Sequence, residues 1–359
     1  MSVFRTRAAL GLRPLTAPLI LFLPIGMILG PSVLGVLSTD ALGYLDIVVP
    51  VGLATLGVFI GLALGREGRA ARVVFAAASS EAIVTIVTVA AAVLFLLTVW
   101  KIPIDVPYAV VAAALGICAS ASAAPAIDKD DDPGARIAGR VADLDDVVPI
   151  VFGGLILGAF GPSSASAVGS LVMTIALGLA IGLAGWLLIE PAESPAERGV
   201  FVLGCLALLG GTAAYLGLSP LLAGMAAGWL WVVAPGRCDL LMSSDLRKLQ
   251  HPLVVLLLLT AGAQLRPTLV GVWLFAPYLV FRLVGKLIGG WTASRIASDV
   301  APSDLGAYLI APGVIGIAFA LTLRLVAGES AQSMLFAVAC GAIASELLAL
   351  FVVPARKGA

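Results

Sequence analysis

The stretch VADLDDVVPIVFGGLILG, Val141–Gly158, places two adjacent carboxylates, Asp145 and Asp146, near the start of a segment that is otherwise apolar. The segment is long enough to enter a lipid bilayer. A charged side chain at membrane depth costs roughly 2.5–3.5 kcal/mol on insertion scales. Two neighbouring acids there require a counter-charge, a bound cation, protons or a water-filled cavity, and the working hypothesis is that they carry ions.

The composition of the whole chain is that of a membrane protein. Hydrophobic residues make up 61% of the 359 residues and charged residues only 12%, whereas a soluble domain is about half apolar and a quarter charged. We therefore expect an all-α polytopic membrane protein. The formal net charge is zero, so nothing indicates a nucleic-acid partner, and the single histidine, His251, is expected in a charged loop.

The apolar runs predict about twelve transmembrane helices, each of roughly 20 residues. They are Leu15–Val36, Leu45–Leu64, Val73–Val99, Val106–Ile127, Val141–Gly158, Ser166–Ile189, Val200–Leu216, Ser219–Val233, Pro252–Leu265, Val272–Ile296, Leu305–Val326 and Ser333–Val353.

The loop charges support this topology through the positive-inside rule. With the N-terminus placed in the cytoplasm, 16 of the 21 basic residues lie in cytoplasmic segments. The external segments contain Lys101 and Arg266, and Arg282, Lys286 and Arg324 fall inside spans. We therefore expect both termini to be cytoplasmic.

Two of the predicted spans contain helix-breaking sequences. The fourth contains ASASAAP (Ala119–Pro125) and the eleventh contains APGVIG (Ala311–Gly316). Proline removes a helical hydrogen-bond donor, and such breaks persist at membrane depth where protein or a wet cavity satisfies the freed backbone groups. Spans three to five and ten to twelve share one pattern and have opposite orientations. An inverted repeat with corresponding discontinuous helices indicates a secondary-transporter site.

The adjacent acids have the properties of an exchange site. Asp145 and Asp146 project about 100° apart around a helix, so they can line one cavity. Burial and mutual repulsion favour the protonated carboxyl, whereas a nearby cation favours the charged form. The same carboxylate can thus hold a proton or a hard cation such as Na⁺. The alternative is an acid pair at a helix N-terminus, stabilised by the helix dipole and hydrated.

Further ionisable residues lie inside the spans. Lys286 is near the centre of the tenth, with Arg282 one turn earlier on the same face. We expect Lys286 to pair with one of the aspartates and to release a proton when a cation takes that partner, because lysine loses its proton readily when desolvated. Arg282 is the weaker candidate and is expected to satisfy broken-helix carbonyls. Glu81 and Glu346 are expected to make structural hydrogen bonds to a broken helix, with ion handling as the alternative.

Five stretches, in order along nearly the whole chain, resemble the monovalent cation:proton antiporter superfamily, specifically its bacterial Na⁺/H⁺ antiporter-like branch. They are GMILGPSVLG (Gly26–Gly35), LDDVV (Leu144–Val148), FRLVGKLIGG (Phe281–Gly290), LIAPGVIGIAFAL (Leu309–Leu321) and SELLALFVVP (Ser345–Pro354).

The resemblance implies an inverted-repeat antiporter fold in which the fourth and eleventh helices are discontinuous and cross. It implies an ion-binding core, about residues 70–161 and 268–354, which moves against a dimerisation domain, about 14–65 and 197–265, with 164–190 linking them. It also implies a homodimer in a bacterial inner membrane.

Residue by residue, the resemblance implies that Asp146 is the ion-binding aspartate, which would hold Na⁺, and that Asp145 pairs with a basic residue, Lys286 or Arg282. The Asp-Asp pair is similar to that of the electrogenic class. The broken fourth helix departs from the pattern, because it has no acid before Pro125. Ser120 and Ser122 are the candidates to replace that acid as polar ligands.

The leading interpretation is Na⁺(Li⁺)/H⁺ exchange by a transporter rather than an enzyme, without a cofactor beyond the transported ions. The alternatives are K⁺/H⁺ exchange, ion-coupled transport of an organic anion, and a non-transporting sensor or partner subunit on the same scaffold. An intramembrane aspartyl protease is disfavoured, because two aspartates that share a proton must converge, and here they are adjacent on one helix.

Overall fold

The computed structural model describes residues 18–66, 72–123, 133–160, 166–236, 238–298 and 301–352. All regular secondary structure in these ranges is helical, and the one β-type pairing among them is an isolated antiparallel bridge between Ser122 and Pro312. The chain is a multi-pass helical membrane protein, which confirms the predicted fold class.

The helices are bounded as follows: α1 (Pro18–Leu29), α2 (Thr39–Arg66), α3 (Arg72–Trp100), α4 (Tyr108–Ser120), α5 (Pro133–Asp145), α6 (Val147–Phe160), α7 (Ala167–Ile189), α8 (Pro195–Tyr215), α9 (Pro220–Val233), α10 (Cys238–Ala263), α11 (Leu269–Ile296), α12 (Leu305–Tyr308), α13 (Val314–Ala327), the 3₁₀ turn η3 (Gly328–Ala331) and α14 (Gln332–Val352).

Each of the twelve predicted spans overlaps at least one of these helices. By length and composition, six helical stretches of the described chain are long and apolar enough to cross a membrane, and four shorter apolar helices accompany them. The number twelve stays a prediction, because several spans are interrupted or short.

The fifth predicted span is two helices rather than one. α5 begins at Pro133 and ends at Asp145, and α6 begins at Val147, so Asp146 occupies the break between them. The physical reason is Pro149, which has no N–H to donate to the carbonyl of Asp145 four residues earlier. The aspartates therefore lie midway along the α5–α6 unit. The sequence had suggested a position near the start of a span, and that expectation was wrong.

The ninth predicted span also differs from expectation. α10 starts at Cys238, well before the expected Pro252, so the segment expected to be a charged loop is helical. His251 is exposed within this helix. The segment contains four leucines and one each of methionine, arginine, lysine and glutamine, which are good helix formers.

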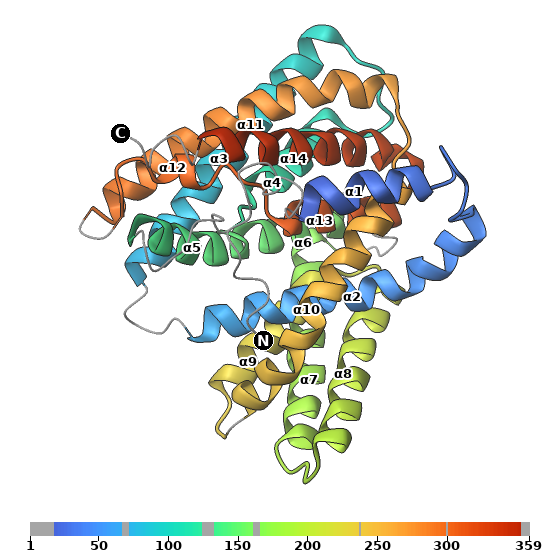
Figure 1. Ribbon diagram of the computed structural model, residues 1–359, viewed down its shortest axis with the longest axis vertical. Coiled ribbons are helices and arrows are strands. Elements are labelled where there is room, and N and C mark those ends of the chain that lie inside the picture. The colour runs from blue at the N-terminus through green and yellow to red at the C-terminus, as the bar shows by residue number, and fades with distance from the viewer. Residues whose placement is uncertain are drawn as a thin grey trace, which may run out of the picture.

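The helices form two groups that meet in the middle of the molecule. In Figure 1, α3, α4, α11 and α14 gather towards one end and α7, α8 and α9 towards the other. Contacts are dense between α3 and α11 in the first group, and between α9 of the second group and α2, which runs across the middle of the molecule. On α9, a Cβ atom at Gly224 would lie 1.9 Å from the carbonyl oxygen of Ala54 in α2. Glycine is therefore required where these two backbones touch, as is common between membrane helices.

Candidate functional site

The two predicted helix breaks meet in space. α4 ends at Ser120 and is followed by extended backbone, and residues 309–313 interrupt the chain between α12 and α13. The amide of Ala123 donates to the carbonyl of Ala311 at 2.9 Å, and the amide of Gly313 donates to that of Ala121 at 3.1 Å. These bonds satisfy backbone groups that the broken helices leave free.

Arg282 satisfies further carbonyls of this crossing. Its side chain is fully buried in α11, with Nη1 donating to Ile310 O at 2.6 Å and Nη2 donating to Ala121 O at 3.2 Å. A buried guanidinium needs such acceptors, and its planar fork presents several donors in fixed directions. Arg282 therefore binds both broken segments at once.

Lys286, one turn further along α11, faces the acids. Its Nζ atom donates to Ser120 O, to Ser122 Oγ at 2.6 Å and to Asp145 Oδ2 at 3.5 Å. It also forms an ion pair with Glu81 Oε1 at 3.0 Å, and Lys286, Asp145 and Glu81 are all fully buried. Of the two candidate basic residues, it is Lys286 that lies beside Asp145.

The aspartates lie inside the protein. Asp145 is fully buried and Asp146 is 7% exposed. Within the described part of the chain, Oδ1 of each residue has no hydrogen-bond partner. The pair directly precedes the N-terminus of α6, as in the alternative interpretation, but it is buried rather than hydrated. This environment leaves oxygen atoms available to a proton or a cation.

The structure separates the roles expected of the remaining candidates. Ser122 accepts from Lys286 through its hydroxyl, whereas the Ser120 hydroxyl donates to Ile117 O within its own helix, at 2.9 Å. Glu81 pairs with Lys286 and accepts from Thr85 Oγ at 2.9 Å, a different arrangement from the expected bond to a broken helix. Glu346, on α14, is partly buried, and its Oε2 has no partner among the described residues.

Thr85 was missed by the sequence reasoning. It is fully buried one helical turn after Glu81 on α3. The signal available in the sequence was the four-residue spacing, which places the two side chains on the same face of a helix.

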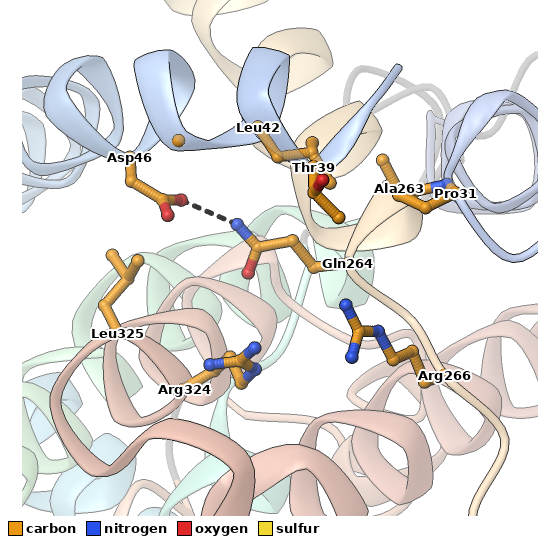
Figure 2. A pocket seen from close by; sticks show the side chains of 10 residues that line it. Pro31, Thr39, Leu42, Asp46, Ala263, Gln264, Arg266, Arg324 and Leu325 are labelled. Carbon is orange, nitrogen blue, oxygen red and sulfur yellow. Dashed lines mark hydrogen bonds between the residues drawn. The ribbon is translucent and has the colours of Figure 1, made fainter. Parts of the chain in front are cut away.

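A separate polar cavity of about 210 Å³ lies at the other end of α13. Figure 2 shows Gln264, which directly follows α10, pointing at Asp46 of α2, with a hydrogen bond of 2.7 Å, and Arg266 and Arg324 on the opposite wall. Arg324 also bonds Gln332, at 2.9 Å. The 14 residues of α13 span about 21 Å, so this cavity is distinct from the helix crossing.

Comparisons with known proteins give a fold. No family model and no curated protein matches the chain by sequence. Among solved structures, that of the sodium proton antiporter MjNhaP1 from Methanocaldococcus jannaschii matches with a TM-score of 0.66 and 16% sequence identity, covering 95% of this chain and 90% of that one. The chain has the sodium/proton antiporter fold.

An antiporter fold agrees with the fold that the resemblance in sequence implied, and with the secondary-transporter site indicated by the broken helices and the inverted repeat. Because the match extends over 95% of the chain, it includes the great majority of the helices described above. The likeness in sequence is low, so the identity of the transported ion and the role of each residue are proposals.

Proposed function

We propose that the chain is a secondary active antiporter that exchanges a monovalent cation, Na⁺ or Li⁺ in the first instance, for protons by alternating access. The observation that supports this most directly is the pair Asp145 and Asp146, buried at the break between α5 and α6 with an unpartnered oxygen on each. A buried carboxylate without a partner is costly in its charged form. Binding either a proton or a cation removes that cost.

The two bound states are mutually exclusive at the same atoms. Protonation forms an O–H bond on an aspartate and cancels the charge that attracts the cation. Cation binding requires the carboxylate form, so the proton leaves and its electron pair stays on the oxygen. Among the described residues no three His, Cys, Asp or Glu side chains converge as a metal site. We therefore propose that aspartate oxygens, with Asp146 as the main ligand, and water bind the cation.

The movement that exposes this site to the two sides of the membrane is part of the proposal. The core, about residues 70–161 and 268–354, moves against the scaffold, about 14–65 and 197–265, with 164–190 linking them. The scaffold is also the proposed surface for a homodimer. We place the protein in a bacterial inner membrane with both termini in the cytoplasm; the terminal residues 1–17 and 353–359 lie outside the described part of the chain.

Electrogenic exchange, the expectation from the Asp-Asp pair, adds a requirement. One proton exchanged for one Na⁺ moves no net charge, so an electrogenic cycle needs a second proton. In such a cycle Lys286 would lose its proton when the cation takes Asp145.

The proposal is tested by reconstituting the protein in liposomes with a trapped pH-sensitive dye and adding Na⁺, Li⁺, K⁺ or choline. We expect Na⁺ or Li⁺ to drive proton movement, choline to drive none, and Asp146→Asn to abolish the response. Asp143→Asn is the matched control, since Asp143 lies one turn earlier and is exposed. A full response from Asp146→Asn would contradict the assignment.

The same assay separates the other candidates. A response to K⁺ alone identifies K⁺/H⁺ exchange. No response to any cation favours a non-transporting subunit or an organic-anion carrier. The anion carrier is disfavoured by the geometry, because both Arg282 and Lys286 donate to acceptors within the protein.

A further inference from the structure

Glu81 is a buried acid that the exchange scheme above does not use. It lies on α3, fully buried, with Oε1 3.0 Å from Lys286 Nζ. Thr85 donates to the same oxygen, and Oε2 has no hydrogen-bond partner among the described residues. A buried carboxylate in this position depends on the ammonium group for compensation of its charge.

The contact between Glu81 and Lys286 is supported by the packing of their helices. Gly285 and Gly289 lie on either side of Lys286 on α11, and both face α3. A Cβ atom at Gly289 would lie 2.8 Å from the carbonyl oxygen of Glu81, and one at Gly285 would lie 3.1 Å from Thr85 Cα. The two backbones therefore touch where the ion pair forms.

The hydrogen bonds of Lys286 indicate which acceptor replaces Asp145 when Asp145 binds a cation. An ammonium group has three N–H donors. They now reach Ser120 O, Ser122 Oγ and Asp145 Oδ2, the last at 3.5 Å, the upper limit for a hydrogen bond. A donor released from Asp145 has the Glu81 carboxylate 3.0 Å away. Lys286 then keeps three acceptors, one of them charged, and loss of its proton would leave Glu81 buried without a counter-charge.

We propose that Glu81 is a positioning residue that keeps Lys286 protonated throughout the cycle, so that one proton leaves the aspartates for each cation that enters. This inference rests on the proposed antiport. Its balance is simple: an aspartate O–H bond breaks, the electron pair stays on the carboxylate, and a monovalent cation replaces the proton. The charge of Lys286 is constant, so exchange is electroneutral, in contrast to the expectation from the Asp-Asp pair.

Other ionisable groups near the crossing do not supply a second proton in this scheme. Arg282 donates to Ile310 and Ala121 and stays charged, because arginine does not deprotonate in proteins. Glu346 lies on α14 near Arg282, and Asp143 is exposed. Among the described residues, Glu81 and Asp145 are the carboxylates paired with Lys286.

The test is the null point of exchange in proteoliposomes whose membrane potential is set by K⁺ and valinomycin. A tenfold Na⁺ gradient is balanced by about one pH unit if one proton is exchanged, and by about half a unit at zero potential if two are. We expect the wild type to balance near one unit at every potential. In Glu81→Gln, Lys286 loses its alternative carboxylate, and we expect the null point to move towards half a unit and to depend on potential. Glu193→Gln is the control, because Glu193 is exposed between α7 and α8, and we expect it to have the null point of the wild type.

Failure of this inference and failure of the proposed function give different results. A wild-type null point that shifts with potential overturns the inference and leaves antiport intact. Absence of any cation-dependent proton flux overturns the proposed function, and the inference with it. Lys286→Arg tests the same property without altering Glu81, since arginine keeps its proton. A null point equal to that of the wild type supports the inference, and a different one contradicts it.

Discussion

The guanidinium of Arg282 donates to the carbonyl oxygen of Ile310 at 2.6 Å, across 28 residues of sequence and inside the protein. Its other terminal nitrogen bonds Ala121 in the opposite broken helix. One side chain thus binds both interrupted segments, and its removal tests how much the crossing depends on it.

We expect Arg282→Ala to lower the thermal stability of the purified protein. A hydrogen bond to a charged group contributes about 1.5–3 kcal/mol. The substitution removes two such bonds, one to Ile310 O and one to Ala121 O, although Ala121 O keeps the bond from the amide of Gly313. Arg282→Lys provides an intermediate case, because a single ammonium lacks the fork that reaches both carbonyls. Thermal unfolding in detergent, followed by tryptophan fluorescence, gives the melting temperatures. We expect the wild type to have the highest, Arg282→Lys an intermediate one and Arg282→Ala the lowest. Equal melting temperatures for Arg282→Ala and the wild type would contradict this role.

The close packing of α2 against α9 predicts a large difference between two glycine-to-alanine substitutions. The new methyl group of Gly224→Ala would lie 1.9 Å from Ala54 O, whereas that of Gly204→Ala on α8 would have nothing within 4 Å. Overpacking costs about 1–3 kcal/mol, and alanine is favoured over glycine in a helix by up to about 1 kcal/mol. We expect Gly224→Ala to have a lower melting temperature than the wild type, and Gly204→Ala to have an equal or higher one.

Competition at the aspartates predicts how the apparent cation affinity depends on pH. Protonation of the site removes its negative charge, so affinity falls as pH falls and is greatest where the aspartates are ionised. With one competing proton the decrease is about tenfold per pH unit in the acidic range. Titration of Na⁺ at a series of pH values gives the slope. A pH-independent affinity in the wild type would be inconsistent with shared ligands.

The hydrogen bonds of Gln332 beside the polar cavity predict how their removal changes access to that cavity. Gln332 is 2% exposed, accepts from Arg324 and donates to the carbonyl of Gln264, so it connects α14 to α13 and to the residue that follows α10. If the core moves against the scaffold, Gln332→Leu favours separation of the two at this cavity, because it removes the hydrogen bond between Gln332 and Gln264. We expect a cysteine placed at Thr39, which lines the cavity, to react faster with a membrane-impermeant maleimide in the Gln332→Leu background.

The matched control for this labelling experiment is Ser330→Ala, because Ser330 is exposed in the adjoining turn. An unchanged labelling rate in Gln332→Leu would show that this network does not hold the cavity closed.

The sequence predicted the helix class, the two meeting breaks and the proximity of Lys286 to one of the two aspartates, because charges at membrane depth must find partners and few candidates exist. It left open which aspartate this would be. It did not predict the break at Asp146, although Pro149 was a usable signal. It also missed the pairing of Glu81 with Lys286. That pairing depends on which faces of α3 and α11 meet, and this follows from the close approach at Gly285 and Gly289 in three dimensions.

The paired amides and carbonyls of Ala121, Ala123, Ala311 and Gly313 have a consequence for selectivity. Peptide oxygens engaged in these bonds, or bound by Arg282, are not free to replace the hydration shell of an ion in the manner of a carbonyl cage. A cation at this crossing therefore sheds water mainly in exchange for flexible carboxylate oxygens, which adjust to ions of different radius. We expect such a site to discriminate modestly between Li⁺ and Na⁺, and to rank them by dehydration energy more than by fit.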